Sequence, residues 1–211
     1  MPTKGERTRA EIVRRSAALL NARGFLATPV SAIVAATGIQ KGGLYRHFAS
    51  REALGLAALD FAVAQVRDRF LQALADGPAD ACGQLLALLD AYDPAKVAGG
   101  GEPALPLPGG CPIMNAAIEA DHADPALRAR AQAAMKGWQS LVQSLVARGI
   151  SRGEIRADAE PQQVATVFIA CIEGAVMLSH LQRSAAPLAA VRAHLRAHVE
   201  HTLRPPKGSP P

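Results

Sequence analysis

The chain has 211 residues, of which 49% are hydrophobic and only 4% aromatic, and it contains three cysteines. This composition excludes a disordered chain, and abundant alanine with few aromatic residues favours helices over a β-sandwich. Three cysteines are too few for a disulfide scaffold, and residues 1–15 lack the apolar run of a signal peptide. We therefore expect a cytoplasmic protein of one or two domains.

The positive charge is concentrated at the start of the chain. Residues 1–51 contain nine lysines and arginines against two glutamates, whereas the other 160 residues contain 14 basic and 16 acidic side chains. This asymmetry predicts a segment that binds a polyanion, attached to a nearly neutral body. A membrane surface is the alternative partner, but the segment lacks the bulky apolar face of an interfacial helix.

Three helices are predicted in the first 50 residues. Apolar residues at near-helical spacing place them over 8–22, 30–37 and 41–48, and Gly24 and Gly38 end the first two. Ser50 then lies at an N-cap position, with Glu52 in the first turn of the next helix.

Six further helices are predicted after Ser50. Their expected spans are 51–75, 79–92, 112–121, 125–148, 160 or 161 to 183, and 187–203. Residues 93–110 are rich in glycine and proline and predict an irregular loop, and residues 205–211 predict a disordered tail. No strand alternation persists, so the expected fold class is all-α with about nine helices.

The mostly apolar stretch 164–181 has two interpretations. Its eighteen residues are long enough for a transmembrane helix. However, Glu173, Ser179 and His180 lie within it, and no second span accompanies it. A helix buried in a core or a dimer interface is the better interpretation, so we expect no membrane partner.

Two short helices joined by a tight turn with glycine form a helix-turn-helix pattern. The turn is TGIQ at 37–40, and the second helix begins KGGLYRHF, in which Leu44 and Phe48 are predicted to face the core. Gly42 and Gly43 keep the first turn slim, so that backbone can approach DNA. The candidate phosphate donors in this helix are Lys41, Tyr45, Arg46 and His47.

The run GFLATPVSAIVAATGIQKGGLYRHFASREAL, from Gly24 to Leu54, resembles the DNA-binding head of the TetR family of bacterial transcriptional repressors. The LYRHF run followed by a Ser-Arg-Glu helix start is its most specific part. The resemblance implies a helix-turn-helix domain over 1–50 and a ligand-binding and dimerisation body over 51–204. It also implies a nine-helix homodimer that pairs through its last two helices and binds a small-molecule inducer.

The same resemblance assigns DNA contacts to individual residues. Thr28, Lys41, Tyr45 and His47 would contact phosphates, and Gln40, Gly42 and Gly43 would lie nearest the base edges. The chain departs from the commonest pattern at Gln40, usually serine, and at Thr37, usually alanine. A glutamine reads adenine through its amide or faces a phosphate, so the operator sequence stays open. For Tyr45 and His47 the alternative is surface packing.

The inducer pocket is predicted among residues 52–183. Such pockets are mainly apolar, so the scarce aromatic residues and the methionines are the candidates, and Trp138 is the strongest for a wall. The residues assigned to the pocket are Phe61, Tyr92, Met114, Trp138, Phe168 and Met177. The alternative is that these residues are merely core.

Cys111 is a candidate redox sensor. It follows two glycines and precedes Pro112, so its sulfur is expected at a helix N-terminus, where the dipole favours the reactive thiolate. Some branches of the TetR family with a similar Gly-Cys pair sense electrophiles or oxidants through cysteine. The alternative is a small buried residue at a helix start, and Cys82 and Cys171 are expected to be inert core thiols.

Two other constellations are weaker. His194, His198 and His201 share a helical stripe that suggests a metal site, but no cysteine or carboxylate completes it. Asp121 and His122 near Cys111 suggest a nucleophile pair, but no oxyanion donors accompany them. We expect no metal, no cofactor and no enzymatic activity.

Together these observations predict a ligand-responsive transcriptional regulator, most simply a repressor. It would bind a palindromic operator in double-stranded DNA as a homodimer, and a small apolar or electrophilic inducer would release it. Two alternatives stay open. One keeps the DNA binding and makes Cys111 the sensor, and the other is a helical small-molecule-binding protein or enzyme with an incidental basic head.

Overall fold

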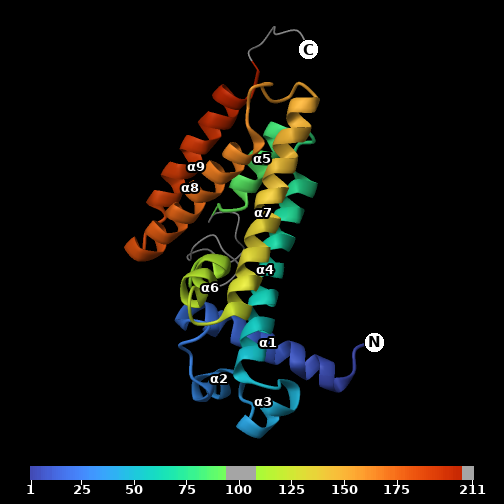
Figure 1. Cartoon of the computed structure of the whole chain (residues 1–211), viewed down its shortest axis with the longest axis vertical. Coiled ribbons are helices and arrows are strands. Elements are labelled where there is room, and N and C mark those ends of the chain that lie inside the picture. The colour runs from blue at the N-terminus through green and yellow to red at the C-terminus, as the bar shows by residue number, and fades with distance from the viewer. Residues whose placement is uncertain (94–107, 206–211) are drawn as a thin grey trace. The chain divides into compact units, whose positions relative to one another are not determined.

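The computed structural model describes residues 1–93 and 108–205 (Figure 1). Over these residues the regular structure is entirely helical, which confirms the predicted all-α fold of about nine helices. The helices are α1 (Lys4–Arg23), α2 (Val30–Thr37), α3 (Lys41–His47), α4 (Arg51–Asp76), α5 (Ala81–Asp90), α6 (Pro112–Ala120), α7 (Pro125–Ser151), α8 (Pro161–Gln182), α9 (Ala186–His198) and the π-helical turn η2 (Val199–Leu203). Most of the predicted loop and nearly all of the predicted tail lie outside the described residues.

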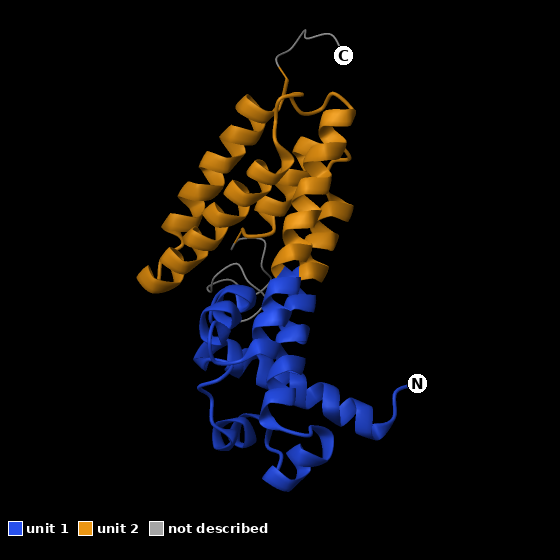
Figure 2. Ribbon diagram, viewed as in Figure 1, with its two compact units in different colours: residues 1–66, 105–134 blue, residues 67–104, 135–211 orange. Residues whose placement is uncertain are grey.

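The chain divides into two compact units, each described by itself (Figure 2). Unit 1 comprises residues 1–66 and 105–134, and unit 2 comprises residues 67–104 and 135–211. The three helices predicted for the head lie in unit 1 together with α6, whereas α4 and α7 contribute residues to both units.

A capping box starts α1 one turn earlier than predicted. The Thr3 hydroxyl accepts from the backbone N–H of Glu6 at 3.2 Å, and the Glu6 carboxylate accepts from the N–H of Thr3 at 2.7 Å. Two of the N–H groups that every helix start leaves without intrahelical partners are thereby satisfied. The helix then buries Ile12, Ala17 and Leu20 in the interior of unit 1.

A buried polar network ties the start of α6 to α1. Asn21 donates through Nδ2 to the carbonyl oxygens of Pro108 and Gly110, at 2.8 and 3.0 Å. Asn115 donates through Nδ2 to the carbonyl oxygen of Gly109 at 2.8 Å and to Oδ1 of Asn21 at 3.1 Å. Asn21 is only 3% exposed, so breaking these bonds would strand polar groups away from water. We call this set the Asn21–Asn115 network.

Glu119 of α6 makes a second tie to the end of α1. Its Oε2 accepts from the backbone N–H of Leu26 at 2.7 Å. Gly24, the C-cap of α1, has a φ of 102°, and a Cβ at this position would overlap the Glu119 carboxylate. Glycine is therefore needed both for the backbone conformation and for the close approach of α6.

Unit 2 is built on α8 packed against α9, with α5 also contacting α9 and η2. Leu85 and Leu89 of α5 and Leu195 of α9 are buried there. Arg192 of α9 also ties to the end of α5, pairing with Asp93 at 2.9 Å and Asp90 at 3.3 Å.

Among the described residues, α8 is the one helix long and apolar enough to cross a membrane, and 44% of its most apolar window is buried. One face is buried through residues such as Phe168, Ile172 and Val176. The other side leaves Leu178 and Leu181 exposed. The apolar residues of α8 thus fall on two sides of the helix, one buried in the interior of unit 2 and one exposed.

The Asn21–Asn115 network predicts that Gly109 cannot be replaced. Its φ is 101°, and a Cβ would overlap the carbonyl oxygen of Asn21 and lie 2.7 Å from Cα of Ala22. We expect Gly109→Ala to lower the free energy of unfolding by about 2 kcal/mol, measured by urea denaturation. Gly137→Ala is the control, because Gly137 lies in α7 with no atom near its Cβ direction. It should raise stability by about 0.5–1 kcal/mol, and equal effects of the two variants would refute the argument.

Candidate functional site

The turn between α2 and α3 is closed by Thr37 and Gly38. Gly38 has a φ of 71°, and its N–H donates to the carbonyl of Val34 at 2.9 Å. The Thr37 hydroxyl donates to the carbonyl of Ile33 at 2.8 Å and accepts from the N–H of Ile39 at 3.4 Å. Thr37 is buried, so its hydroxyl belongs to the turn. The departure from alanine at this position therefore has a structural role.

The inward face of α3 is apolar, as predicted. Leu44 is 1% exposed and Phe48 is 3% exposed. The Arg9 guanidinium of α1 lies 4.8 Å from the centre of the ring of Phe48, the C-cap of α3, a cation–π contact between the first helix and the end of the third. A Cβ at Gly43 would lie 2.9 Å from the Ile39 side chain, so Gly43 is small for packing reasons.

The outward side of α3 carries hydrogen-bond donors. Tyr45 is 41% exposed, and Lys41 and Arg46 are also exposed and form no ion pair among the described residues. Gly42 is exposed with open space in its Cβ direction, so a partner can approach the backbone there. Gln40 at the N-cap is exposed, and His47 is half-buried. Free cations and donors on one short helix are what phosphate recognition requires. We call Gln40, Lys41, Gly42, Tyr45, Arg46 and His47 the α3 surface.

Thr28 lies in the interior and not on this surface. Its side chain is 1% exposed, and its hydroxyl donates to the carbonyl of Gly24 at 2.7 Å. The expected phosphate contact is therefore not supported, because the hydroxyl already closes the turn that precedes α2.

Arg51 is a residue of this region that the sequence analysis missed. Its guanidinium donates from Nη2 to the carbonyl of Phe25 at 2.6 Å and from Nε to the carbonyl of Thr28 at 3.0 Å. One side chain at the start of α4 thereby fixes the segment that leads into α2. The only local sign was its place within the Ser-Arg-Glu helix start.

Part of the positive charge of the first 51 residues is neutralised within α1. Glu11 accepts hydrogen bonds from Arg14 and Arg15, which lower the pKa of its carboxyl to about 2. Glu11 is thus ionised at neutral pH and offsets one of these two cations. The charge of Lys41 and Arg46 is not offset in this way.

The predicted pocket residues are spread over both units. Phe61 and Met114 are half-buried in unit 1, and Phe168 is buried in unit 2. Met177 is 49% exposed on α8, so it faces outward in the described chain, and its assignment to a pocket wall stays a prediction.

Three aromatic rings gather within unit 2. The Phe70 ring centre lies 5.6 Å from those of Tyr92 and Trp138, and the latter two are 6.4 Å apart. Trp138 is 7% exposed, and its buried indole N–H has no hydrogen-bond partner in the described chain. This aromatic trio brings two of the predicted pocket residues, Tyr92 and Trp138, together with Phe70, which was not among the assigned residues.

The cysteines differ in their surroundings. Cys111 occupies the N-cap of α6, as predicted, but its side chain is only 4% exposed. Its role as a sensor stays a prediction with no observation in its favour. Burial raises the pKa of the Cys82 thiol, which donates to the carbonyl of Glu154 at 3.4 Å, and Cys171 is half-buried on α8.

The placement of Thr28 generates a test of its structural role. Thr28→Val removes a buried hydroxyl–carbonyl bond with little change of shape, and should lower the free energy of unfolding by about 1 kcal/mol. Thr8→Val is the matched control, because Thr8 makes the same bond to the residue four positions earlier, Lys4, but in an exposed position. Denaturant titration should show little change for the control. If Thr28→Val left the free energy of unfolding unchanged, the structural role would be contradicted and the Thr28 hydroxyl would again be a candidate for DNA contact.

Comparison with known proteins agrees with this geometry. Residues 12–58 match the family model of bacterial regulatory proteins of the tetR family, and residues 84–195 match that of the tetracyclin repressor-like C-terminal domain. The chain is 41% identical to a TetR transcriptional regulator of Chloroflexus aurantiacus J-10-FL whose structure is solved. That comparison covers 95% of this chain and 98% of the other, with a TM-score of 0.86.

Two further relatives are similar along most of the chain. A TetR-family regulator from Cytophaga hutchinsonii is 28% identical, with 98% of this chain and 100% of the other covered and a TM-score of 0.87. The HTH-type transcriptional repressor DhaR of Mycobacterium sp. strain GP1 is 25% identical over 184 residues, which are 85% of this chain and 86% of that protein.

Proposed function

The chain belongs to the TetR family of bacterial transcriptional regulators, and we propose that it is a ligand-responsive repressor that binds a palindromic operator as a homodimer. Regulators of this family are DNA-binding proteins without enzymatic activity, so the alternative of an enzyme with an incidental basic head is wrong. The observation that carries the proposal is the α3 surface, where Lys41 and Arg46 stand exposed over a buried apolar face.

In this proposal α3 is the recognition helix and lies in the major groove. Lys41, Tyr45 and Arg46 donate to phosphates and fix the register of the head on the duplex. Gly42 allows the backbone to approach the base edges, and Gln40 at the N-cap offers an amide to a base or a phosphate. His47 is half-buried and contributes at the edge of the contact. Thr28 and Arg51 act indirectly, by holding the turn before α2.

The homodimer is proposed to form through α8 and α9. Val167, Leu178 and Leu181 of α8 are 48%, 40% and 76% exposed, and Met177 lies beside them. Two residues between them are small, because Ala170 is exposed and Gly174 has open space in its Cβ direction. On α9, exposed alanines recur at helical spacing, at Ala190, Ala193 and Ala197. Apolar and small faces on two neighbouring helices suit close packing against the same helices of a second copy.

Two α3 helices in such a dimer would enter successive major grooves about 34–36 Å apart, which is why the operator is expected to be palindromic. A small apolar or electrophilic inducer bound in the helical body would favour a state whose spacing no longer fits DNA. The Asn21–Asn115 network supports this mechanism, because its hydrogen bonds would transmit a displacement of α6 to α1. We place the regulator in the cytoplasm, where it meets DNA.

The α3 surface predicts a charge-specific loss of DNA affinity. With an operator recovered by selection from random duplexes, Lys41→Ala should weaken binding and reduce the salt dependence, the slope of log K against log salt, by about 0.9. Lys136→Ala is the control, because Lys136 is an exposed lysine on α7 in unit 2. Fluorescence anisotropy at several salt concentrations measures both. Equal slopes for wild type and Lys41→Ala would remove Lys41 from the interface.

The exposed face of α8 predicts dimerisation that one charge disrupts. Leu178→Glu should raise the dimer dissociation constant at least about tenfold, because a carboxylate would be buried without a partner. Leu71→Glu is the matched control, since Leu71 is 50% exposed on α4. Sedimentation equilibrium measures the mass of each variant. A wild-type monomer at micromolar concentration, or an undisturbed Leu178→Glu dimer, would contradict this interface.

A further inference from the structure

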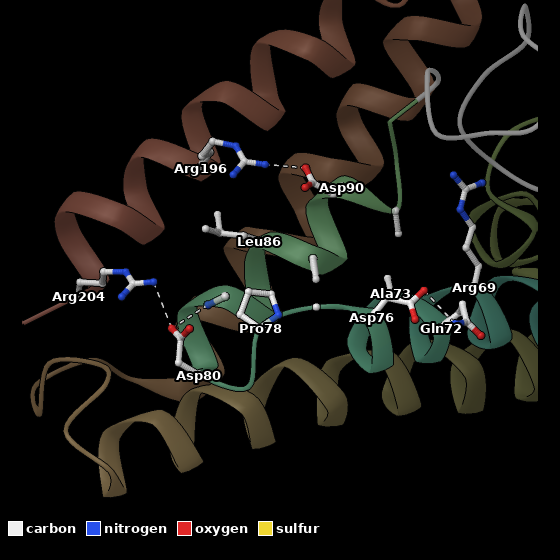
Figure 3. Close-up of a pocket in the computed structure, with 14 residues that line it drawn as sticks. Arg69, Gln72, Ala73, Asp76, Pro78, Asp80, Leu86, Asp90, Arg196 and Arg204 are labelled. Carbon is white, nitrogen blue, oxygen red and sulfur yellow. Dashed lines mark hydrogen bonds and ion pairs between the residues drawn. The ribbon is translucent and has the colours of Figure 1, made fainter.

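Unit 2 contains a groove of about 650 Å³ that the proposed function does not use (Figure 3). Its walls are the last turns of α4, the connection to α5, α5 itself, Arg196 of α9 and Arg204, the residue after η2. The volume falls in the range of small-molecule sites. None of the rings of the aromatic trio lines it, so it is distinct from the predicted inducer residues.

Most charged groups of the groove are already engaged with one another. Arg196 pairs with Asp90 at 2.6 Å, and Arg204 pairs with Asp80 at 3.1 Å. These two ion pairs stand along the groove in Figure 3, so neither arginine is left over for a ligand.

Arg69 differs from the other two arginines of the groove. Its half-buried guanidinium has neither a hydrogen bond nor an ion pair in the described chain. Burial lowers the pKa of Arg69, and the one titratable group that acts against this is Tyr92. Asp76 also lines the groove, but it lies two helical turns, about 10 Å, further along α4 and accepts a hydrogen bond from Gln72 at 2.9 Å. A partly desolvated cation without an anion is costly, and an anionic ligand would relieve that cost.

Apolar surface lies next to Arg69. Ala73 follows it by one turn on α4, and Ala87 of α5 lines the same groove. The end of α4 and α5 approach closely here, since a Cβ at Gly77 would lie 2.8 Å from Cβ of Ala87 and 2.9 Å from the carbonyl oxygen of Ala73. A ligand held at Arg69 would therefore place its body on small apolar side chains.

We propose that this groove binds a small carboxylate with a short apolar body. The Arg69 guanidinium would receive the carboxylate, for which its planar pair of donors is suited, and Ala73 and Ala87 would contact the body. A monoanion matches Arg69, the one cation among the described residues of the groove that forms no ion pair. A phosphate dianion would bring a second negative charge near Asp76 and Asp90 without a cation to meet it.

The test is calorimetric titration of the DNA-free full-length protein with hexanoate. The expected result is saturable binding of one hexanoate per chain. The neutral hexanamide and inorganic phosphate should each bind at least about tenfold more weakly than hexanoate. Arg69→Gln should weaken hexanoate binding by at least about tenfold. Arg67→Gln is the control, because Arg67 is an exposed arginine on the same helix that pairs with Asp68 at 3.3 Å and does not line the groove.

A second variant keeps the test decisive if Arg69→Gln does not fold. Gln72→Glu places a carboxylate on the exposed surface of α4, three residues from Arg69, and should compete with hexanoate for the guanidinium. The proposal is overturned if wild type shows no saturable binding up to about 10 mM, a concentration that detects even millimolar affinity. It is also overturned if hexanamide or phosphate binds as tightly as hexanoate, or if the folded variants bind like wild type. Because no DNA is present, a failure to bind hexanoate does not contradict the proposed repressor function. Likewise, a failure of the chain to bind an operator would not contradict hexanoate binding in the groove.

Discussion

The Asn21–Asn115 network is the interaction on which the architecture of unit 1 depends. The amides of buried Asn21 and half-buried Asn115 satisfy three consecutive carbonyl groups, those of Pro108, Gly109 and Gly110, just where the chain enters α6. Buried carbonyls without hydrogen-bond partners are costly, so these bonds hold residues 108–110 in one position against α1. Glu119 then fixes the far part of α6 to the turn after α1. The head and α6 consequently behave as one body.

The head separates structural from recognition residues by satisfying the former internally. Thr28, Thr37 and Arg51 all carry hydrogen-bond donors, yet each donates to backbone carbonyls within the head. Lys41 and Arg46 remain exposed on a helix whose other side is locked by buried apolar side chains. The same division recurs in unit 2, where α8 buries one apolar face and leaves another open. The side chains available to a partner are therefore those that make no contacts within the interior.

Local signals predicted most of the helices, because hydrophobic periodicity and helix caps depend on residues that are close in the sequence. The bounds of α2 and the N-caps at Ser50 and Cys111 agree with the structure. The sequence analysis missed contacts that depend on distant partners: Asn21 and Asn115 are 94 residues apart, and nothing local marks either of them. The exposure of Met177 was not foreseen for a related reason, since periodicity cannot tell a face that packs inside one chain from one left open.

The aromatic trio has a spectroscopic consequence. Trp138 is the chain's single tryptophan, and it is packed against Phe70 and Tyr92 in unit 2. Its emission therefore reports the integrity of that unit alone, whereas far-ultraviolet circular dichroism sums the helices of both units. Coincident melting curves from the two signals would mean that the units unfold together, and separated curves would give each unit its own stability. The protein thus carries an internal fluorophore that resolves its halves without labelling.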